Sequence, residues 1–185
     1  MEQQNYEQRG YLHEDFRLFH LEEAMTAPVD WHYHTFHKII AFLSGSASYG
    51  IEGKSYVLEA GDLILVPSGC IHRPEIAPGA PYERIILYIS PEFLRTAGTP
   101  DCDLEACFAK AQAEFMFVLR PGAERRALLG ALLALEREQP SQAFGRTLLE
   151  RALVLQFLIG VRRGMEENRL EAIRSTACDE KVVAI

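Results

Sequence analysis

Three histidines, His32, His34 and His72, are the residues whose type and spacing are best suited to chemistry. His32 and His34 are two positions apart, and Lys38 follows at another even spacing. Because alternate residues of a strand point to the same face, we expect His32, His34 and Lys38 to share one side of one strand. A barrel that brings residues 67–72 alongside that strand would add His72. Three neutral imidazoles could then hold a divalent transition metal such as zinc, nickel or iron, with positions left open for water or substrate.

Lys38 complicates this metal hypothesis, because it stands where a metal site would have a carboxylate. A protonated lysine close to a divalent cation is electrostatically unfavourable, so burial and repulsion would lower its pKa. The neighbouring His37 is expected to face the other way, unless a bulge intervenes.

Two other interpretations of these residues are open. The histidines could be satisfied polar residues of a barrel that never carries metal. Lys38 could attract a carboxylate or another anionic ligand into a cavity, or it could lie at the surface, at the mouth of the barrel. The sequence therefore predicts a ligand-binding cluster of His32, His34, Lys38 and His72, in which the three histidines are the candidate metal ligands.

The composition is that of an ordinary globular protein and argues against several classes of protein. Apolar residues make up 48% of the 185 residues, and charged residues make up 24%. The formal net charge of −7 argues against a surface that grips nucleic acid by itself, because such surfaces are basic. No apolar run approaches the roughly 20 residues that span a bilayer, and the polar N-terminus lacks the features of a secretory signal. We therefore expect a cytoplasmic protein whose four cysteines are reduced.

The first half of the chain has the pattern of short strands separated by Gly and Pro. The expected strands are residues 16–21, 38–43, 47–51, 55–58, 63–66 and 84–90. Strands of this length and spacing are typical of a small all-β barrel or sandwich.

After Pro91 the periodicity becomes that of helices. The predicted elements are a helix that Asp101 or Asp103 caps and that ends near residue 112, a strand at 115–119, a helix at 123–138 and a helix at 142–163. Gly164 is expected to cap the last of these helices.

The last predicted helix carries a broad apolar stripe, made of Leu148, Leu149, Ala152, Leu153, Leu155, Gln156 and Ile159. Such a stripe packs against the barrel or the neighbouring helix, or forms part of a subunit interface.

Three stretches of the first half carry a specific similarity: Trp31-His-Tyr-His34, Lys38-Ile-Ile-Ala-Phe-Leu-Ser-Gly45 and Leu58-Glu-Ala-Gly-Asp-Leu-Ile-Leu-Val-Pro-Ser-Gly-Cys-Ile-His72. Together they resemble the N-terminal effector-binding domain of AraC-type transcription regulators, a cupin barrel followed by helices. The resemblance covers residues 16–164. This chain departs from the family at Lys38, where glutamate is usual, and from metal cupins at Ile76, where asparagine is frequent. Both departures argue against an enzyme-like metal centre.

The resemblance implies a fold that is mainly β with α: a small cupin (double-stranded β-helix) barrel followed by a C-terminal helical segment. Residues 1–98 would form the effector-binding barrel, and residues 99–178 the helical and dimerisation segment. Residues 179–185 resemble the start of a helix-turn-helix DNA-binding domain, which implies a chain cut just inside that domain.

The implied function is ligand sensing and dimerisation in a transcription regulator, not catalysis. A small-molecule effector would bind in the barrel, two copies would pair through the C-terminal helices, and DNA would be contacted only through the helix-turn-helix domain. Sugars, aromatic acids and drug-like compounds all suit a barrel lined by Tyr, Phe and His.

Two rival functions use the same histidines. One is a single-domain metal-dependent cupin enzyme, of the dioxygenase or isomerase type, with His32, His34 and His72 as ligands. Such enzymes usually keep a carboxylate where this chain has Lys38, which favours the regulator. The other is a cupin that binds metal for structural reasons alone.

Overall fold

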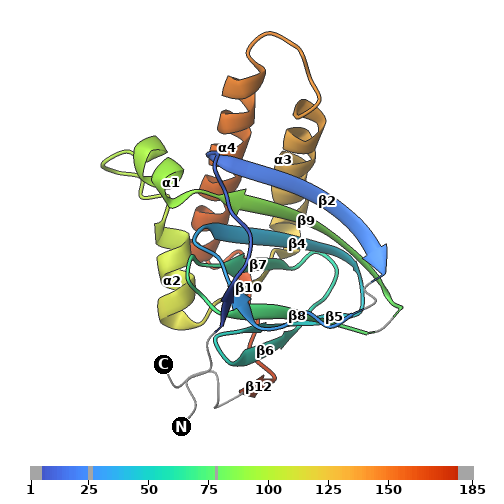
Figure 1. Cartoon of the computed structure of the whole chain (residues 1–185). Coiled ribbons are helices and arrows are strands. Elements are labelled where there is room, and N and C mark those ends of the chain that lie inside the picture. The colour runs from blue at the N-terminus through green and yellow to red at the C-terminus, as the bar shows by residue number, and fades with distance from the viewer. Residues whose placement is uncertain (1–5, 25–26, 78, 179–185) are drawn as a thin grey trace.

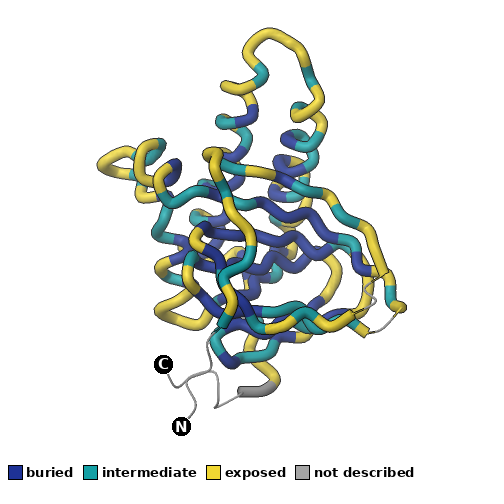
Figure 2. Tube along the Cα trace, viewed as in Figure 1, coloured by how far each residue is buried: buried dark blue, intermediate teal, exposed yellow. Residues whose placement is uncertain are grey.

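The computed structural model of the chain describes residues 6–24, 27–77 and 79–178. Within these residues, two six-stranded sheets lie one above the other (Figure 1). A continuous apolar core fills the space between the sheets and extends under the helices. Figure 2 shows this core as the dark blue centre of the molecule.

The first sheet contains the strands that carry the histidines. Its strand order is β1 (Glu7–Gln8), β3 (His32–Tyr33), β8 (His72–Ile76), β5 (Ala47–Ile51), β6 (Lys54–Val57) and β12 (Ala177–Cys178). Strands β5 and β6 form a hairpin at Glu52-Gly53, where both residues have positive φ angles of 48° and 73°. Such angles are typical of the tight turns that join antiparallel strands.

The second sheet faces the first and carries Lys38. Its order is β11 (Glu171–Ala172), β10 (Val118–Arg120), β7 (Leu63–Val66), β4 (His37–Gly45), β9 (Pro81–Ile89) and β2 (Phe16–Ala24). All four residues of β7 and the first six of β4 are buried. The sequences of these strands are therefore largely continuous apolar runs, because one face of each strand contacts the core between the sheets and the other face contacts helices.

The helices lie on the outer side of the second sheet. They are α1 (Pro91–Ala97), α2 (Ala106–Glu114), the short 3-10 helix η1 (Gly122–Glu124), α3 (Arg125–Glu138) and α4 (Arg146–Glu166). Helix α3 packs against α4 and β2, and α2 packs against α4 and β7. In Figure 1, α3 and α4 form an antiparallel pair whose connected ends extend past the sheets. Among the described helices, none is long and apolar enough to cross a membrane.

The expected fold class, mainly β with C-terminal helices, is confirmed. Strands at 47–51 and 63–66 have the predicted bounds. The structure adds α1 and β8, which the sequence pattern did not indicate. The predicted boundary between residues 98 and 99 stays a prediction; β10, β11 and β12 from the later segment pair with strands of the earlier one. The predicted start of a DNA-binding domain at 179–185 lies outside the described residues.

The predicted C-cap at Gly164 is wrong. Helix α4 continues to Glu166, and Gly164 is buried where Leu170 folds back against the helix. A Cβ at this position would lie 2.6 Å from Leu170 Cγ. The glycine is therefore explained by a close packing contact and not by the end of the helix.

A partly buried ion pair joins two neighbouring strands of the second sheet, β10 and β7. Arg120 on β10 donates two hydrogen bonds, of 2.9 and 3.0 Å, to the carboxylate of Asp62, which precedes β7. Asp62 is fully buried and also accepts the amide N–H of Glu59 at 2.8 Å. This network holds the strand that follows α2 against the strands of the first half.

Candidate functional site

The structure brings the three predicted histidines together between the sheets. His32 on β3 pairs directly with His72 on β8, and His34 lies just after β3. One nitrogen from each ring lies within 4.8 Å of those of the other two. All three residues are buried. The spacing of the donor atoms is compatible with one shared metal ion after small side-chain movements.

Main-chain carbonyl groups fix the tautomer of each imidazole. The Nδ1 atoms of His32 and His72 lie 2.8 Å and 3.0 Å from the carbonyl oxygens of Asp30 and Cys70. The Nδ1 of His34 contacts the carbonyl oxygen of Arg9. A carbonyl oxygen can only accept, so each Nδ1 carries the hydrogen and each Nε2 keeps its lone pair. The same arrangement orients histidines that bind metals.

Two of the free nitrogens have no hydrogen-bond partner among the described residues. Nε2 of His34 and Nε2 of His72 are buried, and neither has a hydrogen bond to any described residue. Buried polar atoms are nearly always paired, so these two acceptors indicate a site that a bound group would complete.

The histidines are neutral at pH 7. Burial is the main cause that lowers the pKa of His34 to about 4, and the charge of Lys38 lowers it further. Burial and Lys38 also hold the pKa of His72 well below its usual value, and burial lowers that of His32. Neutral imidazole is the form that binds metal ions.

Lys38 reaches the cluster from the opposite sheet. It is buried on β4, its Nζ donates a hydrogen bond of 3.4 Å to the hydroxyl of Tyr49, and it lies 5.9 Å from the centre of the Tyr88 ring. Burial, with a contribution from Arg84, lowers its pKa to about 7. No carboxylate among the described residues forms an ion pair with Lys38. It is thus an interior residue and not one at the mouth of the barrel.

The expectation that His32, His34 and Lys38 share one strand is wrong. Strand β3 ends at Tyr33 and β4 begins at His37, and the two strands belong to different sheets. The chain crosses from one sheet to the other between them, with the buried Phe36 in the crossing segment. The residues converge because both strands turn these side chains towards the space between the sheets.

His37 faces away from the cluster, as predicted. Its ring stacks on Phe108 of α2 with centroids 4.2 Å apart, and its Nδ1 accepts the amide N–H of Ser68 at 3.2 Å. Burial lowers its pKa to about 4, as for His34. His37 is therefore a buried histidine of similar character outside the candidate site.

Sequence reasoning missed two tyrosines of the site. Tyr49 is fully buried on β5, and its ring stacks on His72 with centroids 6.0 Å apart. Tyr88 on β9 lies 5.9 Å from His34, centroid to centroid. Burial raises the pKa of both phenols, so they are hydrogen-bond donors at pH 7. Both lie on strands that the sequence pattern predicted, at 47–51 and 84–90, and these strands are the signal that could have directed attention to them.

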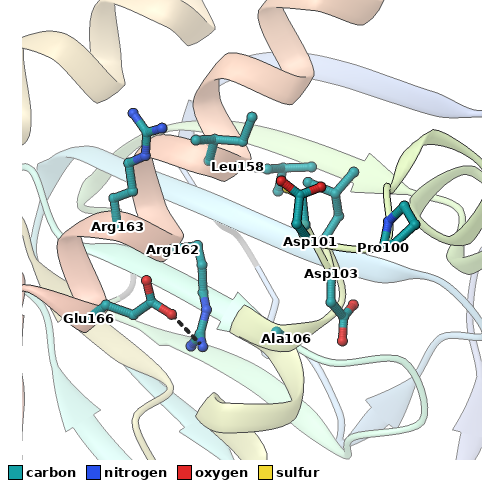
Figure 3. A pocket seen from close by; sticks show the side chains of 11 residues that line it. Pro100, Asp101, Asp103, Ala106, Leu158, Arg162, Arg163 and Glu166 are labelled. Carbon is teal, nitrogen blue, oxygen red and sulfur yellow. Dashed lines mark ion pairs between the residues drawn. The ribbon is translucent and has the colours of Figure 1, made fainter.

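A hollow of about 570 Å³ lies outside the sheets, away from the histidines, between α4 and the loop that precedes α2 (Figure 3). Arg162 projects into it from α4 and pairs with Glu166 at 2.7 Å, while its Nη1 is buried with no hydrogen bond to a described residue. Asp101 and Asp103 line the opposite wall. Its charges are mixed, and it contains none of the predicted ligand-binding residues His32, His34, Lys38 and His72.

Comparison with known proteins gives one family. Residues 20–169 match the AraC-like ligand binding domain. None of the curated proteins matches the chain.

Several solved structures are similar to part of the chain. The polyketide cyclase RemF from Streptomyces resistomycificus is 22% identical over 40% of this chain and 54% of its own, with a TM-score of 0.36. A cupin-like protein from Thermotoga maritima is 21% identical over 43% of this chain and 60% of its own, with a TM-score of 0.38. A predicted oxalate decarboxylase from the same organism is 23% identical over 41% of this chain and 68% of its own, also with a TM-score of 0.38. The chain thus spans little more than half of the first two, and similarities this distant say nothing about its activity.

Proposed function

Because the chain belongs to the family of AraC-like ligand binding domains, we propose that it is the ligand-sensing and dimerisation domain of an AraC-type transcription regulator. A small-molecule effector would bind between the sheets of its cupin-like fold. DNA would be contacted only through a separate helix-turn-helix domain, and the protein would act in the cytoplasm as a regulator, not as an enzyme.

The observation that carries this proposal is the group of unsatisfied polar atoms inside the domain. Among the described residues, the Nε2 atoms of His34 and His72 are buried acceptors without a partner, and the buried Lys38 has a single, long hydrogen bond, to Tyr49. Burying polar groups without partners is costly, so such a cluster is retained where a ligand completes it.

The donors around the cluster indicate the chemistry of the effector. Lys38, Tyr49 and Tyr88 all offer N–H or O–H groups, so they suit an effector with acceptor oxygens, such as a carboxylate or a carbonyl group. Aromatic rings surround these donors: Phe36 and Tyr88 lie 4.4 Å apart, centroid to centroid. An aromatic or otherwise planar acid would contact both the hydrogen-bond donors and the aromatic rings, and a hydroxyl-rich ligand would contact the donors.

A divalent transition metal is part of the proposal, because the three histidines fit one. Their Nε2 lone pairs are free, their tautomers are fixed and they are neutral at pH 7. His32, His34 and His72 would hold zinc, nickel or iron, all of which bind imidazole. When bound, such an ion would supply a Lewis acid to which an acceptor oxygen of the effector could bind.

The α3–α4 pair would form the dimer interface. Leu148 and Leu149 near the start of α4 are 74% and 46% exposed, and Phe144 in the preceding loop is fully exposed. Small residues of α3, including Ala127, Gly130 and Ala134, line a groove beside α4. Exposed apolar side chains next to a groove of small residues suit the helices of a second copy.

Signalling would follow if the effector changes how the two copies are arranged. Helix α2 packs against both α4 and β7, and β7 pairs with β4, the strand of Lys38. A ligand that prefers one arrangement of the sheets would thereby shift the population of dimer arrangements.

The proposal is tested in two steps. First, a panel of small carboxylic acids, sugars and aromatic compounds is screened for a rise in the melting temperature of the chain. A true effector should no longer raise the melting temperature of the Lys38→Met variant. It should still raise that of Arg162→Gln, which alters the hollow beside α4. Second, the full-length regulator is titrated with its DNA in the presence and absence of the effector. An affinity for DNA that does not depend on the effector would contradict the proposal.

The rival metal-dependent enzyme rests on the same three histidines. Lys38 distinguishes the two functions, because a buried cation beside the metal opposes metal-centred catalysis. Stoichiometric metal together with oxygen consumption on an added substrate would favour the enzyme over the sensor.

A further inference from the structure

His20 on β2 connects the second sheet to helix α3, which packs against that strand (Figure 1). Its Nδ1 lies 2.9 Å from Oε1 of Glu136 on α3, and its Nε2 lies 3.2 Å from Oε1 of Glu83 on β9. All three side chains are partly exposed. The ring can therefore exchange a proton with solvent while it stays in contact with both carboxylates.

The two contacts require a proton on each ring nitrogen. An ionised carboxylate can only accept a hydrogen bond, whereas a neutral imidazole carries a hydrogen on one nitrogen alone. Only the imidazolium form of His20 can therefore donate to Glu136 and Glu83 at the same time. Loss of its proton breaks one of the two hydrogen bonds and turns a ring lone pair towards a carboxylate.

The groups around the ring favour the charged form. On β2, Glu22 lies two residues further along on the same face as His20. From β4, the uncharged Ser44 donates its hydroxyl to Oε2 of Glu83 at 3.1 Å. Burial lowers the pKa of His20, but the hydrogen bonds and charges of Glu136 and Glu83 outweigh it and raise the pKa above its usual value. The folded chain thus binds this proton more tightly than the unfolded chain.

The contact with α3 is made at the C-terminal end of the helix. Glu136 belongs to the last turn, and the residues one turn away on its face include the uncharged Leu132 and Gln139. The side-chain amide of Gln139 donates a hydrogen bond of 3.3 Å to the carbonyl oxygen of Leu18 on β2. A negative charge near a helix C-terminus is unfavourable, so Glu136 depends on the positive charge of His20.

We propose that His20 is a proton-operated clasp, which holds the C-terminal end of α3 on the second sheet and releases it as pH rises. That end leads to Phe144 and Leu148, which are exposed and belong to the surface that the proposed function assigns to dimerisation. The effect on pairing rests on that proposed function. A released α3 must be ordered again when two copies pair, so the protonated clasp favours the dimer.

The contribution of the clasp to stability has a definite direction with pH. Because the pKa of His20 is raised on folding, this contribution is complete below about pH 6.5 and is lost as pH rises through the folded-state value. The buried His34 and His37 act in the opposite direction, since burial lowers their pKa values to about 4. Comparing wild type with a variant of His20 alone, at each pH, separates the two effects.

Hydrogen exchange of the backbone amides of α3 tests the clasp. Wild type and His20→Gln are compared at the same pH, so that the intrinsic exchange rates cancel. At pH 6 the amides near Glu136 should exchange about 2- to 30-fold faster in His20→Gln, the effect expected of two partly exposed charged contacts. At pH 8.5 the two chains should agree.

The matched control for this measurement is His13→Gln. His13 is an exposed histidine that stacks on Tyr11, and it should leave the exchange of α3 unchanged at both pH values. Equal exchange in wild type and His20→Gln at pH 6 would overturn the clasp.

Sedimentation velocity at pH 6 and pH 8.5 tests the effect on pairing. The dissociation constant of the wild-type dimer should be about 2- to 30-fold higher at pH 8.5, and that of His20→Gln should change less. A wild-type dimer whose affinity depends on pH no more than that of His20→Gln would overturn the effect on pairing. A chain that is monomeric at both pH values, yet shows the exchange difference, would contradict the proposed dimer interface and support the clasp alone.

Discussion

His32 and His72 lie directly opposite each other in antiparallel strands, and their ring centroids are 4.4 Å apart. Directly opposed residues have the shortest cross-strand separation in a sheet, so the pairing of β3 with β8 places two imidazoles side by side without any loop. His34 completes the group from the residue after β3. The site is therefore built on strand register, which makes it rigid before a ligand binds.

Replacing one of the paired histidines should strongly weaken metal binding without unfolding the chain. We expect His72→Ala to reduce zinc affinity on the order of 100-fold or more, because the loss of a ligand exceeds the effect of losing an outer partner. His37→Ala is the matched control, since His37 is equally buried but stacks on Phe108 outside the site. Isothermal titration of both variants with zinc measures the difference. Equal affinities would show that the cluster is not the metal site.

Stability should fall as the solution becomes acidic between about pH 6.5 and pH 4. The pKa values of His34 and His37 are lowered to about 4 in the folded state, so in this range the unfolded chain binds protons that the folded chain does not. Stability is therefore greatest above pH 6.5 and is lost as pH falls towards 4. Between pH 8 and pH 5, each of these histidines should reduce the free energy of unfolding by about 2 kcal/mol.

Urea unfolding at pH 8 and pH 5 measures this loss. The variant His37→Gln should show a shallower dependence, because one of the contributing groups is gone. A free energy of unfolding that is the same at both values, for the wild-type chain without metal, would contradict neutral burial of the histidines.

The sequence could predict this site only as far as the alternation of side chains along a strand allows. Even spacing correctly indicated that His32, His34 and Lys38 share an environment. It could not show whether these residues lie on one strand or on two, because strands of facing sheets both turn alternate side chains into the same interior. Only the three-dimensional crossing at Phe36 distinguishes these cases.

Strand β8 was missed for a related reason. Its residues Arg73, Pro74 and Glu75 are a poor strand sequence, since proline lacks an N–H and the others are charged. The structure accommodates them because β8 pairs with β5 over five residues, and Pro74 lies opposite Tyr49. Tertiary pairing outweighed local propensity here.

Helix α4 shows the limit of amphipathic patterns. The residues that it buries most deeply include Val154, Phe157, Leu158 and Val161, whereas Leu148 and Leu149 of the predicted stripe are exposed. A helix that is apolar over much of its surface has no single stripe, so the pattern cannot say which residues meet the domain. The exposed part is the part that a partner would cover.

Replacing the exposed leucine of α4 should separate the proposed dimer. We expect Leu148→Glu to shift the chain towards monomer by at least about tenfold in the dissociation constant, because it places a charge in an apolar interface at a cost of 1.4 kcal/mol or more. Val57→Glu is the control, since Val57 is 56% exposed on β6, in the sheet that does not carry the helices. Sedimentation velocity over a range of concentrations measures both. A wild-type chain that remains monomeric, or a Leu148→Glu variant that still dimerises fully, would contradict the interface.

Removing the buried amine should stabilise the domain. Lys38 is buried and its pKa is lowered from 10.5 to about 7, so near neutrality folding must either strip a proton from this group or bury its charge. Methionine has a similar length and no charge, and we expect Lys38→Met to raise the free energy of unfolding at pH 7 by roughly 2–4 kcal/mol.

The stability advantage of Lys38→Met should shrink as pH rises from 7 towards 10.5, because the unfolded wild-type chain then loses the same proton. Urea unfolding at pH 7 and pH 10, in buffer without metal, measures this advantage. The control Lys110→Met, on the outer surface, is expected to change stability by less than about 0.5 kcal/mol. A Lys38→Met variant that is no more stable than wild type at pH 7 would mean that the ammonium finds adequate solvation inside the domain. The strain that makes Lys38 available for ligand binding would then be absent.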